Sequence, residues 1–393
     1  LESIQTDKGG FGSDSNMRMG VHGLCLMALL HGGRDRNSAA VKRGLEFIEN
    51  NEWGFKDGAF GGYTYDASVL LMLLQLYYEK ELKQSGMLEA DTPNKYKEAR
   101  QAMWKLLPED HRRRIDQLVE IIGGHRTGPD SGYTYRKYPD RDLASRGDNS
   151  NSQYAMLGYK AAALLGAEFD AKVFQDEADR LLAQMGEIPF LDEVPGVRRQ
   201  DMHEPGDPRK ATGTASGVKP GGWVYSCMKS NGCVPQMTAA GISSLMTCMD
   251  ELKLRGKLEK AAEQKIESAL TSALSTLELR FYDEQGRNEL WGDLCETSQG
   301  WGLYYNLYSI ERGCVLAGAK YLGGTLDWHT IGSEILVKLQ RKDGSWAGRR
   351  YDSSASLENN AKQPIDTSLA ILFLKAAAMP VITESKGKKD SGD

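Results

Sequence analysis

The segment from 303 to 322 places several chemically active side chains on one side of an expected helix. Tyr304, Tyr308, Glu311 and Arg312 fall at positions i, i+4, i+7 and i+8. Two phenols beside a carboxylate and a guanidinium suit the binding of a ligand head group through Tyr304, Tyr308 and Arg312. They also suit general acid catalysis by Glu311, whose pKa burial would raise. The alternative is a structural ion pair that only fixes how neighbouring helices pack.

Polar residues at the starts of other expected helices add to this set. Asp148 and Gln153 lie at the start of one helix, Gln236 opens a second, and Asp366 opens a third. Helix capping accounts for many such residues and contributes about 1 kcal/mol each. If these helix starts converge on one opening, they favour an anionic ligand, although an aspartate there would repel it. We therefore treat Gln153 and Gln236 as ligand-binding candidates, and Asp366, like Glu311, as a catalytic candidate.

The helices that carry these residues belong to a repeat in which a glycine-and-aromatic turn precedes an apolar helix. The clearest turn runs from Leu339 to Trp346. One helical hairpin cannot bury its own apolar face, so several copies must stack against each other. The sequence predicts an all-α (α/α)6 toroid of six hairpins with a central cavity. The six turn aromatics are Phe11, Phe60, Tyr133, Trp223, Trp291 and Trp346.

Composition and charge narrow the class of protein. The chain has 393 residues and a formal net charge of −5 without a basic block, so we expect no nucleic-acid partner. No stretch of about 20 apolar residues is present, so we expect no transmembrane segment. We expect residues 1–380 to form a single toroid domain, with an N-terminal truncation, and residues 381–393 to be a disordered tail. Localisation, in the cytoplasm or the periplasm, and oligomeric state stay open.

Two insertions interrupt the repeat. Residues 83–110 are charged and predict a short helix at 96–106 ahead of an outer helix at 112–122, which we interpret as structural. Residues 187–220 are rich in proline, glycine and charge. A loop of this length in a compact domain is usually mobile or functional. It is therefore either a lid over the cavity or a surface excursion.

Two of the turns resemble a known repeat. Gln340, Gly344 and Trp346 resemble the QW repeat of squalene-hopene cyclases. The segment from Gly221 to Trp223, followed by residues 237–241, resembles the repeats of bacterial prenyltransferase/squalene oxidase-like proteins. The resemblance covers most of the chain. It implies an (α/α)6 toroid whose inner helices line an apolar pocket for isoprenoid chains.

The catalytic motifs of that superfamily are incomplete here. Class II terpene cyclases use an Asp-x-Asp-Asp cluster, and the nearest approach, Asp140 and Asp142, lacks the third aspartate. Protein prenyltransferase β subunits bind zinc through Asp-x-Cys and a histidine. Asp293 and Cys295 match the first element, but Asp366 stands in place of the histidine. Two matching ligands are too few for a zinc site, so we predict no metal and no cofactor.

Three hypotheses for function follow from this toroid. The main one is a protein that binds an isoprenoid or other lipid-like ligand in the central cavity, with or without transforming it. The alternatives are a non-catalytic toroid used for protein interaction and a carbohydrate-active (α/α) barrel. The first predicts a deep aromatic pocket, the second a filled centre, and the third a groove with two carboxylates about 5 to 10 Å apart. The aromatic wall of the first would comprise Trp223, Trp291, Trp301, Tyr304 and Tyr308.

Overall fold

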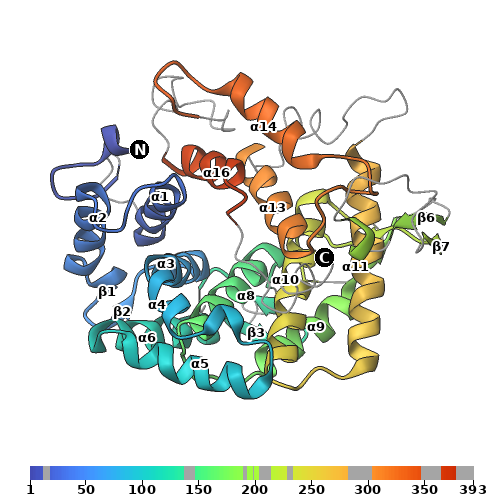
Figure 1. Ribbon diagram of the computed structural model, residues 1–393, viewed down its shortest axis with the longest axis horizontal. Helices are drawn as coiled ribbons and strands as arrows, with labels where there is room; N and C mark the ends of the chain where they lie inside the picture. The colour runs from blue at the N-terminus through green and yellow to red at the C-terminus, as the bar shows by residue number, and fades with distance from the viewer. Residues whose placement is uncertain are drawn as a thin grey trace, which may run out of the picture.

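The computed structural model shows a closed ring of six inner helices (Figure 1). Each inner helix contacts the next in chain order, and the last contacts the first, so the ring has no open end. The inner helices are α1 (Met19–His31), α3 (Thr64–Tyr77), α8 (Asn149–Leu164), α10 (Pro235–Leu254), α13 (Leu303–Leu316) and α16 (Pro364–Leu374). The structure describes residues 1–11, 18–136, 147–188, 193–197, 199–202, 214–227, 233–281, 303–346 and 364–377.

An outer layer of helices surrounds this ring (Figure 1). Helix α2 shows how the layers differ, because it buries one stripe, including Val41, Leu45 and Ile48, and exposes the other. Inner helix α8 is covered on all sides, and each of its residues is buried. This two-layer arrangement confirms the predicted (α/α)6 toroid. The outer helices are α2 (Ala39–Asn50), α6 (Glu109–Gly124), α9 (Lys172–Gln184), α11 (Lys260–Phe281) and α14 (Trp328–Leu339).

The first and last repeats share one turn geometry. The amide of Gln5 donates to the Gly9 carbonyl at 3.1 Å, and the amide of Gln340 donates to the Gly344 carbonyl at the same distance. Both glycines have positive φ, +93° and +81°, which side chains with a Cβ rarely adopt. The sequence similarity between these two turns therefore reflects the same hydrogen bond and the same backbone conformation.

The aromatic residue of the turn ties an outer helix to the next inner helix. The indole N–H of Trp346 donates to the Leu336 carbonyl near the end of α14, at 2.8 Å. Its backbone N–H donates to the Thr367 hydroxyl in the first turn of α16, at 3.1 Å. Trp223 makes the equivalent indole bond to the Leu181 carbonyl of α9, at 2.9 Å. A buried indole N–H needs an acceptor, and the end of the outer helix supplies one.

Short antiparallel ladders complete several turns. β1 (Phe55–Lys56) pairs with β2 (Ala59–Phe60), and β3 (Arg126–Gly128) pairs with β4 (Gly132–Tyr133). β5 (Gly186–Glu187) pairs with β8 (Gly221–Gly222), and the hairpin of β6 (Val194–Val197) and β7 (Thr214–Val218) lies between them in the chain. The first three ladders each join an outer helix to an inner one.

The insertion at 83–110 forms helices on the outside of the ring. It contains the end of α4 (Glu79–Gln84), the single turn η3 (Met87–Glu89) and α5 (Pro93–Leu106). The helix expected at 96–106 is thus present and begins three residues earlier, at a proline that suits the first helical turn. The Tyr96 hydroxyl donates to Glu251 of α10 at 2.9 Å, which anchors α5 to the ring.

The described part of the 187–220 insertion packs against an outer helix. In the turn η4 (Arg199–Met202), the Arg199 guanidinium donates to Glu267 of α11 at 2.6 Å and to the Ala317 carbonyl at 3.1 Å. In Figure 1 the β6–β7 hairpin lies beside α11, away from the inner helices. These residues therefore support the surface excursion, and the intervening residues 203–213 are not among those described.

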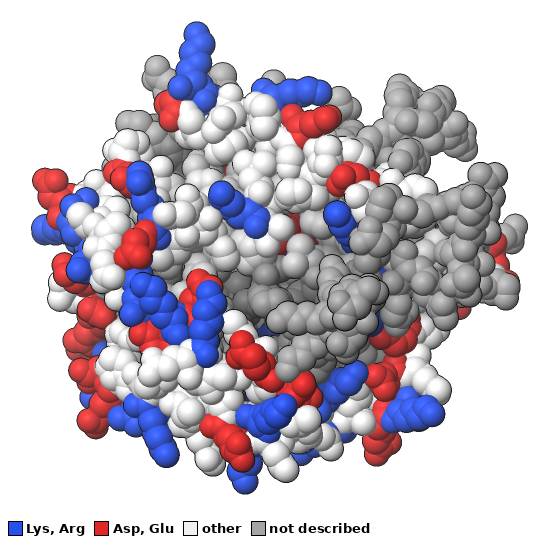
Figure 2. All heavy atoms as spheres, viewed as in Figure 1, with Lys and Arg blue, Asp and Glu red and all other residues white. Residues whose placement is uncertain are grey.

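The described surface is mixed in charge. On the face in Figure 2, lysine and arginine alternate with aspartate and glutamate around the periphery without a patch of one sign. Within the described residues, no helix combines the length and the apolar character that crossing a membrane requires. The tail expected at 381–393 lies outside the described residues.

Candidate ligand site at the hub

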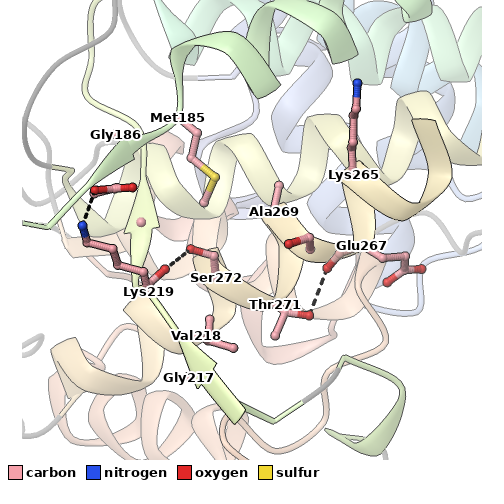
Figure 3. Close-up of a pocket in the computed structure, with 13 residues that line it drawn as sticks. Met185, Gly186, Gly217, Val218, Lys219, Lys265, Glu267, Ala269, Thr271 and Ser272 are labelled. Carbon is pink, nitrogen blue, oxygen red and sulfur yellow. Dashed lines mark hydrogen bonds and ion pairs between the residues drawn. The ribbon is translucent and has the colours of Figure 1, made fainter. Parts of the chain in front are cut away.

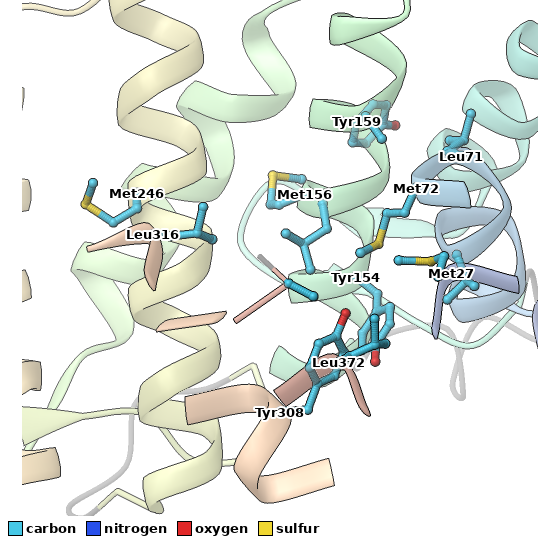
Figure 4. Close-up of a cluster of buried hydrophobic side chains, with 14 of the residues drawn as sticks. Met27, Leu71, Met72, Tyr154, Met156, Tyr159, Met246, Tyr308, Leu316 and Leu372 are labelled. Atoms are coloured by element: carbon cyan, nitrogen blue, oxygen red, sulfur yellow. The ribbon is translucent and has the colours of Figure 1, made fainter. Parts of the chain in front are cut away.

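The four residues of the predicted stripe lie on α13 and are all buried. Tyr304, Tyr308, Glu311 and Arg312 are exposed by 3%, 1%, 0% and 1%. The ring of Tyr308 lies close to Tyr154 of α8 at the centre of the toroid (Figure 4). Since α8 and α13 are separated in the ring by α10, this meeting of side chains crosses the hub.

Apolar side chains occupy much of the hub. Met27, Met72, Met156 and Leu372 come from different inner helices and lie there, and Met246 of α10 lies beside Leu316 (Figure 4). All of them are at most 5% exposed. Methionine fills irregular spaces between helices well because its chain is unbranched and flexible. The described side chains therefore pack the deep part of the hub, and the half-buried aromatic residues lie at its rim.

Six tyrosines form a connected group on this rim, where inner helices begin. We call Tyr63, Tyr65, Tyr135, Tyr154, Tyr225 and Tyr305 the tyrosine cluster. All of them except Tyr154 are half-buried, and Tyr154 is 5% exposed. They come from the N-cap and first turn of α3, from the turn after β4, from α8, from the segment before α10, and from α13.

Hydrogen bonds connect the phenol groups of this cluster across the ring. The Tyr65 hydroxyl donates to the Ser150 hydroxyl at 2.6 Å, and Ser150 is in turn bonded to the Tyr305 hydroxyl. The hydroxyls of Tyr135 and Tyr225 are 2.9 Å apart. Side chains of α3, α8 and α13 thus meet at Ser150, which holds the three helix starts in a fixed arrangement.

Ring contacts join the two halves of the cluster. The centroids of Tyr65 and Tyr154 are 4.5 Å apart, those of Tyr65 and Tyr135 are 5.7 Å apart, and those of Tyr63 and Tyr135 are 5.4 Å apart. Burial raises the pKa of Tyr65 well above its ordinary value. The phenol is therefore protonated at neutral pH and can donate a hydrogen bond.

Asp148 begins α8 beside this cluster. Its carboxylate accepts the backbone N–H of Asn151 at 2.7 Å and the side-chain N–H of Asn151 at 2.8 Å, so it is the N-cap that the sequence suggested. Burial raises the pKa of Asp148, and hydrogen bonds from Asn151 and Tyr225 act in the opposite direction. A buried carboxyl therefore lies at the edge of the tyrosine cluster.

Arg312 lies directly beneath the rim. Its guanidinium carbon is 4.0 Å from the ring centroid of Tyr308 and 4.6 Å from that of Tyr154. Its Nη2 donates to the Gln153 side-chain oxygen at 3.3 Å. Within the described part of the chain no carboxylate forms an ion pair with Arg312, Glu311 included. The sequence-derived candidates Gln153, Tyr308 and Arg312 are thus brought together.

The remaining candidates lie elsewhere or are not described. Trp223 is 1% exposed and ties α9 to α10, with its ring against Gly241. Gln236 and Asp366 are half-buried in the first turns of α10 and α16. Trp291, Trp301, Asp293 and Cys295 lie outside the described residues, as do Asp140 and Asp142. Elsewhere, within the described ranges, no three His, Cys, Asp or Glu side chains gather as metal ligands would.

Sequence reasoning named none of the six cluster tyrosines as site residues, although the chain contains a signal for the cluster. The sequence Gly-Tyr-Thr-Tyr occurs twice, at 62–65 and at 132–135. The two copies contact each other, because the Thr64 backbone N–H donates to the Tyr135 carbonyl at 2.8 Å and its hydroxyl donates to the Thr134 carbonyl at 2.5 Å. This repeated tetrapeptide brings Tyr63, Tyr65 and Tyr135 to the rim together.

A separate groove lies on the outside of the ring. It has a volume of about 920 Å³ and runs between α11 and the strands β5, β7 and β8 (Figure 3). Lys219 pairs with Glu187 across it at 2.5 Å, and Ser272 donates to the Lys219 carbonyl. None of the candidate residues lines this groove. It is therefore distinct from the hub site.

Comparisons with known proteins bear on the fold. No protein-family profile matches the chain, and no curated protein sequence matches it. Among solved structures, the chain is similar to the GH76A alpha-1,6-mannanase from Salegentibacter sp. HEL1_6, with a TM-score of 0.51 and 10% sequence identity. The match covers 95% of this chain and 94% of that one. At this identity the likeness shows the toroid fold alone, and it lends no support to the prenyltransferase family.

Proposed function

We propose that this chain is a carbohydrate-active toroid that binds a glycan at the tyrosine cluster. The observation that carries the proposal is a hydrogen-bonded group of half-buried phenols at the rim of the hub. The likeness to a mannanase toroid is consistent with it, since that fold is used by a protein that acts on a glycan. This is the alternative that the sequence left open, in place of the isoprenoid ligand.

The chemistry of tyrosine favours a sugar over a hydrocarbon chain at this rim. A phenol ring offers an apolar face to the C–H side of a pyranose, and its hydroxyl exchanges hydrogen bonds with sugar hydroxyls. Ligand pockets commonly combine aromatic walls with a few fixed polar groups. An isoprenoid would cover these hydroxyls without offering them a partner, which costs free energy wherever a bond to water is lost.

The packed hub points in the same direction. A long isoprenoid needs a deep apolar pocket, whereas Met72 and Met156 lie buried among neighbours where such a pocket would be. A glycan that approaches from the rim needs no such depth. The proposal therefore uses the half-buried rings of the cluster and leaves the packed part of the hub as core.

Cleavage of a glycosidic bond needs two carboxyl groups with separate roles. The sequence offers Glu311 and Asp366, which we retain as the catalytic candidates. Asp148 is nearer to the tyrosine cluster, but both of its oxygens already accept hydrogen bonds from Asn151, which suits a structural cap. We therefore propose glycan binding first, and cleavage of the glycosidic bond is tested in a separate assay.

The test is a binding measurement with a matched pair of tyrosine variants. The wild-type chain is titrated by calorimetry with neutral oligosaccharides, α-1,6-linked mannotetraose among them, and with acidic ones. Tyr65→Ala removes a cluster ring at the rim end of α3. Tyr77→Ala removes a half-buried tyrosine at the other end of the same helix, about 18 Å away at 1.5 Å per residue.

We expect at least one glycan to bind the wild type and Tyr77→Ala with similar Kd, and Tyr65→Ala to bind it at least about tenfold more weakly. A reducing-sugar assay on the same glycans reports cleavage, and Glu311→Gln and Asp366→Asn test the two acids. Absence of glycan binding, together with a polyprenyl lipid that co-purifies with the chain, would overturn the proposal in favour of the isoprenoid hypothesis.

A further inference from the structure

The guanidinium of Arg312 is buried, and no carboxylate of the described residues forms an ion pair with it. It is 1% exposed, and its Nε and Nη1 atoms have no hydrogen-bond acceptor among the described residues. Its charge is permanent, because an arginine cannot be deprotonated in a protein. Cation–π contact with Tyr154 and Tyr308 stabilises the charge on the ring faces but leaves N–H groups at the edge of the guanidinium unsatisfied.

Gln153 adds a further donor at the same place. Its side-chain oxygen accepts from Arg312 Nη2, and its amide nitrogen has no hydrogen-bond partner within the described ranges. Gln153 is fully buried. Buried polar atoms are normally satisfied, so several unsatisfied donors side by side indicate a place for an acceptor.

Two other buried cations of the described chain have carboxylate partners. Lys160 is 2.7 Å from Asp250, and both are fully buried. Arg180 bonds to Glu177 in the same way. Carboxylates neutralise these two buried cations, whereas no carboxylate among the described residues pairs with Arg312. An uncompensated buried charge is costly, which argues for an anion supplied from outside.

The tyrosine cluster adjoins Arg312 through one ring. Tyr154 contacts Arg312 on one side and has its ring 4.5 Å from the ring of half-buried Tyr65 on the other. Tyr305, also of the cluster, is close enough to raise the pKa of Arg312, although burial alone acts in the opposite direction. For a ligand held against Tyr65 at the rim, only the ring of Tyr154 separates its inner edge from the Arg312 guanidinium.

We propose that Arg312 and Gln153 bind an oxyanion carried by the sugar, so that the substrate class is an acidic glycan. This inference rests on the proposed function, since the glycan is held by the tyrosine cluster. The guanidinium presents N–H groups that suit a carboxylate or a sulfate ester, and the glutamine amide supplies one more donor. The anion would complete the hydrogen bonds that the chain leaves open.

The closing experiment compares matched ligands on matched variants. Trigalacturonic acid carries carboxylates, its carboxyl-reduced form is the neutral galactose trimer, and a 6-sulfated galactose trimer carries sulfate esters. Each is titrated by calorimetry against the wild type, Arg312→Met, and the control Arg180→Met, which removes a buried arginine that has its own carboxylate. Binding of inorganic sulfate and of free galacturonate is measured by thermal shift on the wild type.

We expect the wild type to prefer at least one acidic trimer over the neutral one by about 10- to 100-fold, the range of a charged hydrogen-bonded contact. The better of the two acidic trimers identifies the oxyanion. We expect Arg312→Met to lose this preference and Arg180→Met to keep it. Without ligand, the melting temperature of Arg312→Met should be unchanged or raised, because a lone buried charge is removed. A purely structural arginine would lower it.

The outcomes separate the two proposals. Equal binding of acidic and neutral trimers by the wild type would overturn this inference and leave glycan binding intact. Binding of free anions that is lost in Arg312→Met, without binding of any glycan, would keep the anion site and overturn the glycan. If Arg312→Met fails to fold, the inference is overturned when the wild type neither prefers an acidic trimer nor binds free anions.

Discussion

Removing one partner of the Lys160–Asp250 pair tests how the inner ring is held together. The Lys160 Nζ and an Asp250 carboxylate oxygen are 2.7 Å apart, and both side chains have no exposed surface. They join α8 to α10 in the middle of the toroid. At an effective dielectric constant of about 20 their attraction is about 6 kcal/mol, most of which offsets the desolvation of the two ions.

The expected effect of Lys160→Met is large because it leaves a buried carboxylate without its cation. We expect a loss of about 3 to 5 kcal/mol in the free energy of unfolding. The double variant Lys160→Met/Asp250→Leu removes both charges, and we expect it to recover most of this loss. The measurement is urea unfolding at pH 7, followed by far-ultraviolet circular dichroism.

A surface pair provides the control. Lys172→Met breaks the ion pair with Asp176, in which the lysine side chain is 66% exposed, and should change the free energy of unfolding by less than about 1 kcal/mol. If Lys160→Met cost no more than this control, the reasoning on buried charge would fail. It would fail equally if the double variant were less stable than Lys160→Met.

Two further predictions concern the repeat turns and pH. Gly344→Ala should lower the free energy of unfolding by about 1 to 2 kcal/mol, because its φ is +81°, although a Cβ there meets nothing within 4 Å. Gly9→Ala should lower it more, because its Cβ would also lie 2.0 Å from the Arg43 carbonyl oxygen. Urea unfolding of both variants checks this order. Burial lowers the pKa of His125 to about 4, so the unfolded chain binds more protons below pH 6.5. Stability should fall by about 2 kcal/mol from pH 7 to pH 5 through this group, and a fall of the same size in His125→Asn would refute the assignment.

The fold was predictable because each repeat turn joins an outer helix to the next inner helix with the same kinds of residue. Gln340, Gly344 and Trp346 are recognisable in the sequence since each forms a local bond: glutamine to glycine carbonyl, tryptophan to the preceding helix. Such bonds span few residues, so the residues that form them lie close together in the sequence and can be recognised as a pattern. The closed ring then follows from stacking, and the structure confirms it.

The site was less predictable because its contacts cross the hub. Ser150 and Tyr305 are 155 positions apart in sequence, and Gln153 and Arg312 are 159 apart. Their meeting depends on how the ring closes, which no local pattern encodes. Helical spacing on α13 did identify Tyr308 and Arg312, because a stripe on one helix is a local property.

The role expected of Trp223 shows the limit of residue type as a guide. Aromatic residues in a toroid can line a ligand pocket or can hold a hairpin together, and composition does not separate the two. The indole N–H of Trp223 donates to the Leu181 carbonyl, as that of Trp346 donates to the Leu336 carbonyl. These hydrogen bonds show that both tryptophans hold a hairpin together. The hydroxyls of Tyr135 and Tyr225, by contrast, bond to each other at the rim.

The partners of two buried cations, Lys160 and Arg312, distinguish a structural bond from a candidate binding site within the inner ring. Lys160 and Asp250 complete each other inside the chain, and their bond joins neighbouring helices. Arg312 and Gln153 are equally buried, yet donors on both have no acceptor in the described structure. In low-dielectric surroundings the Lys160–Asp250 bond is strong and holds two helices together. The same surroundings make the unsatisfied donors of Arg312 and Gln153 a place where we propose that an anion binds.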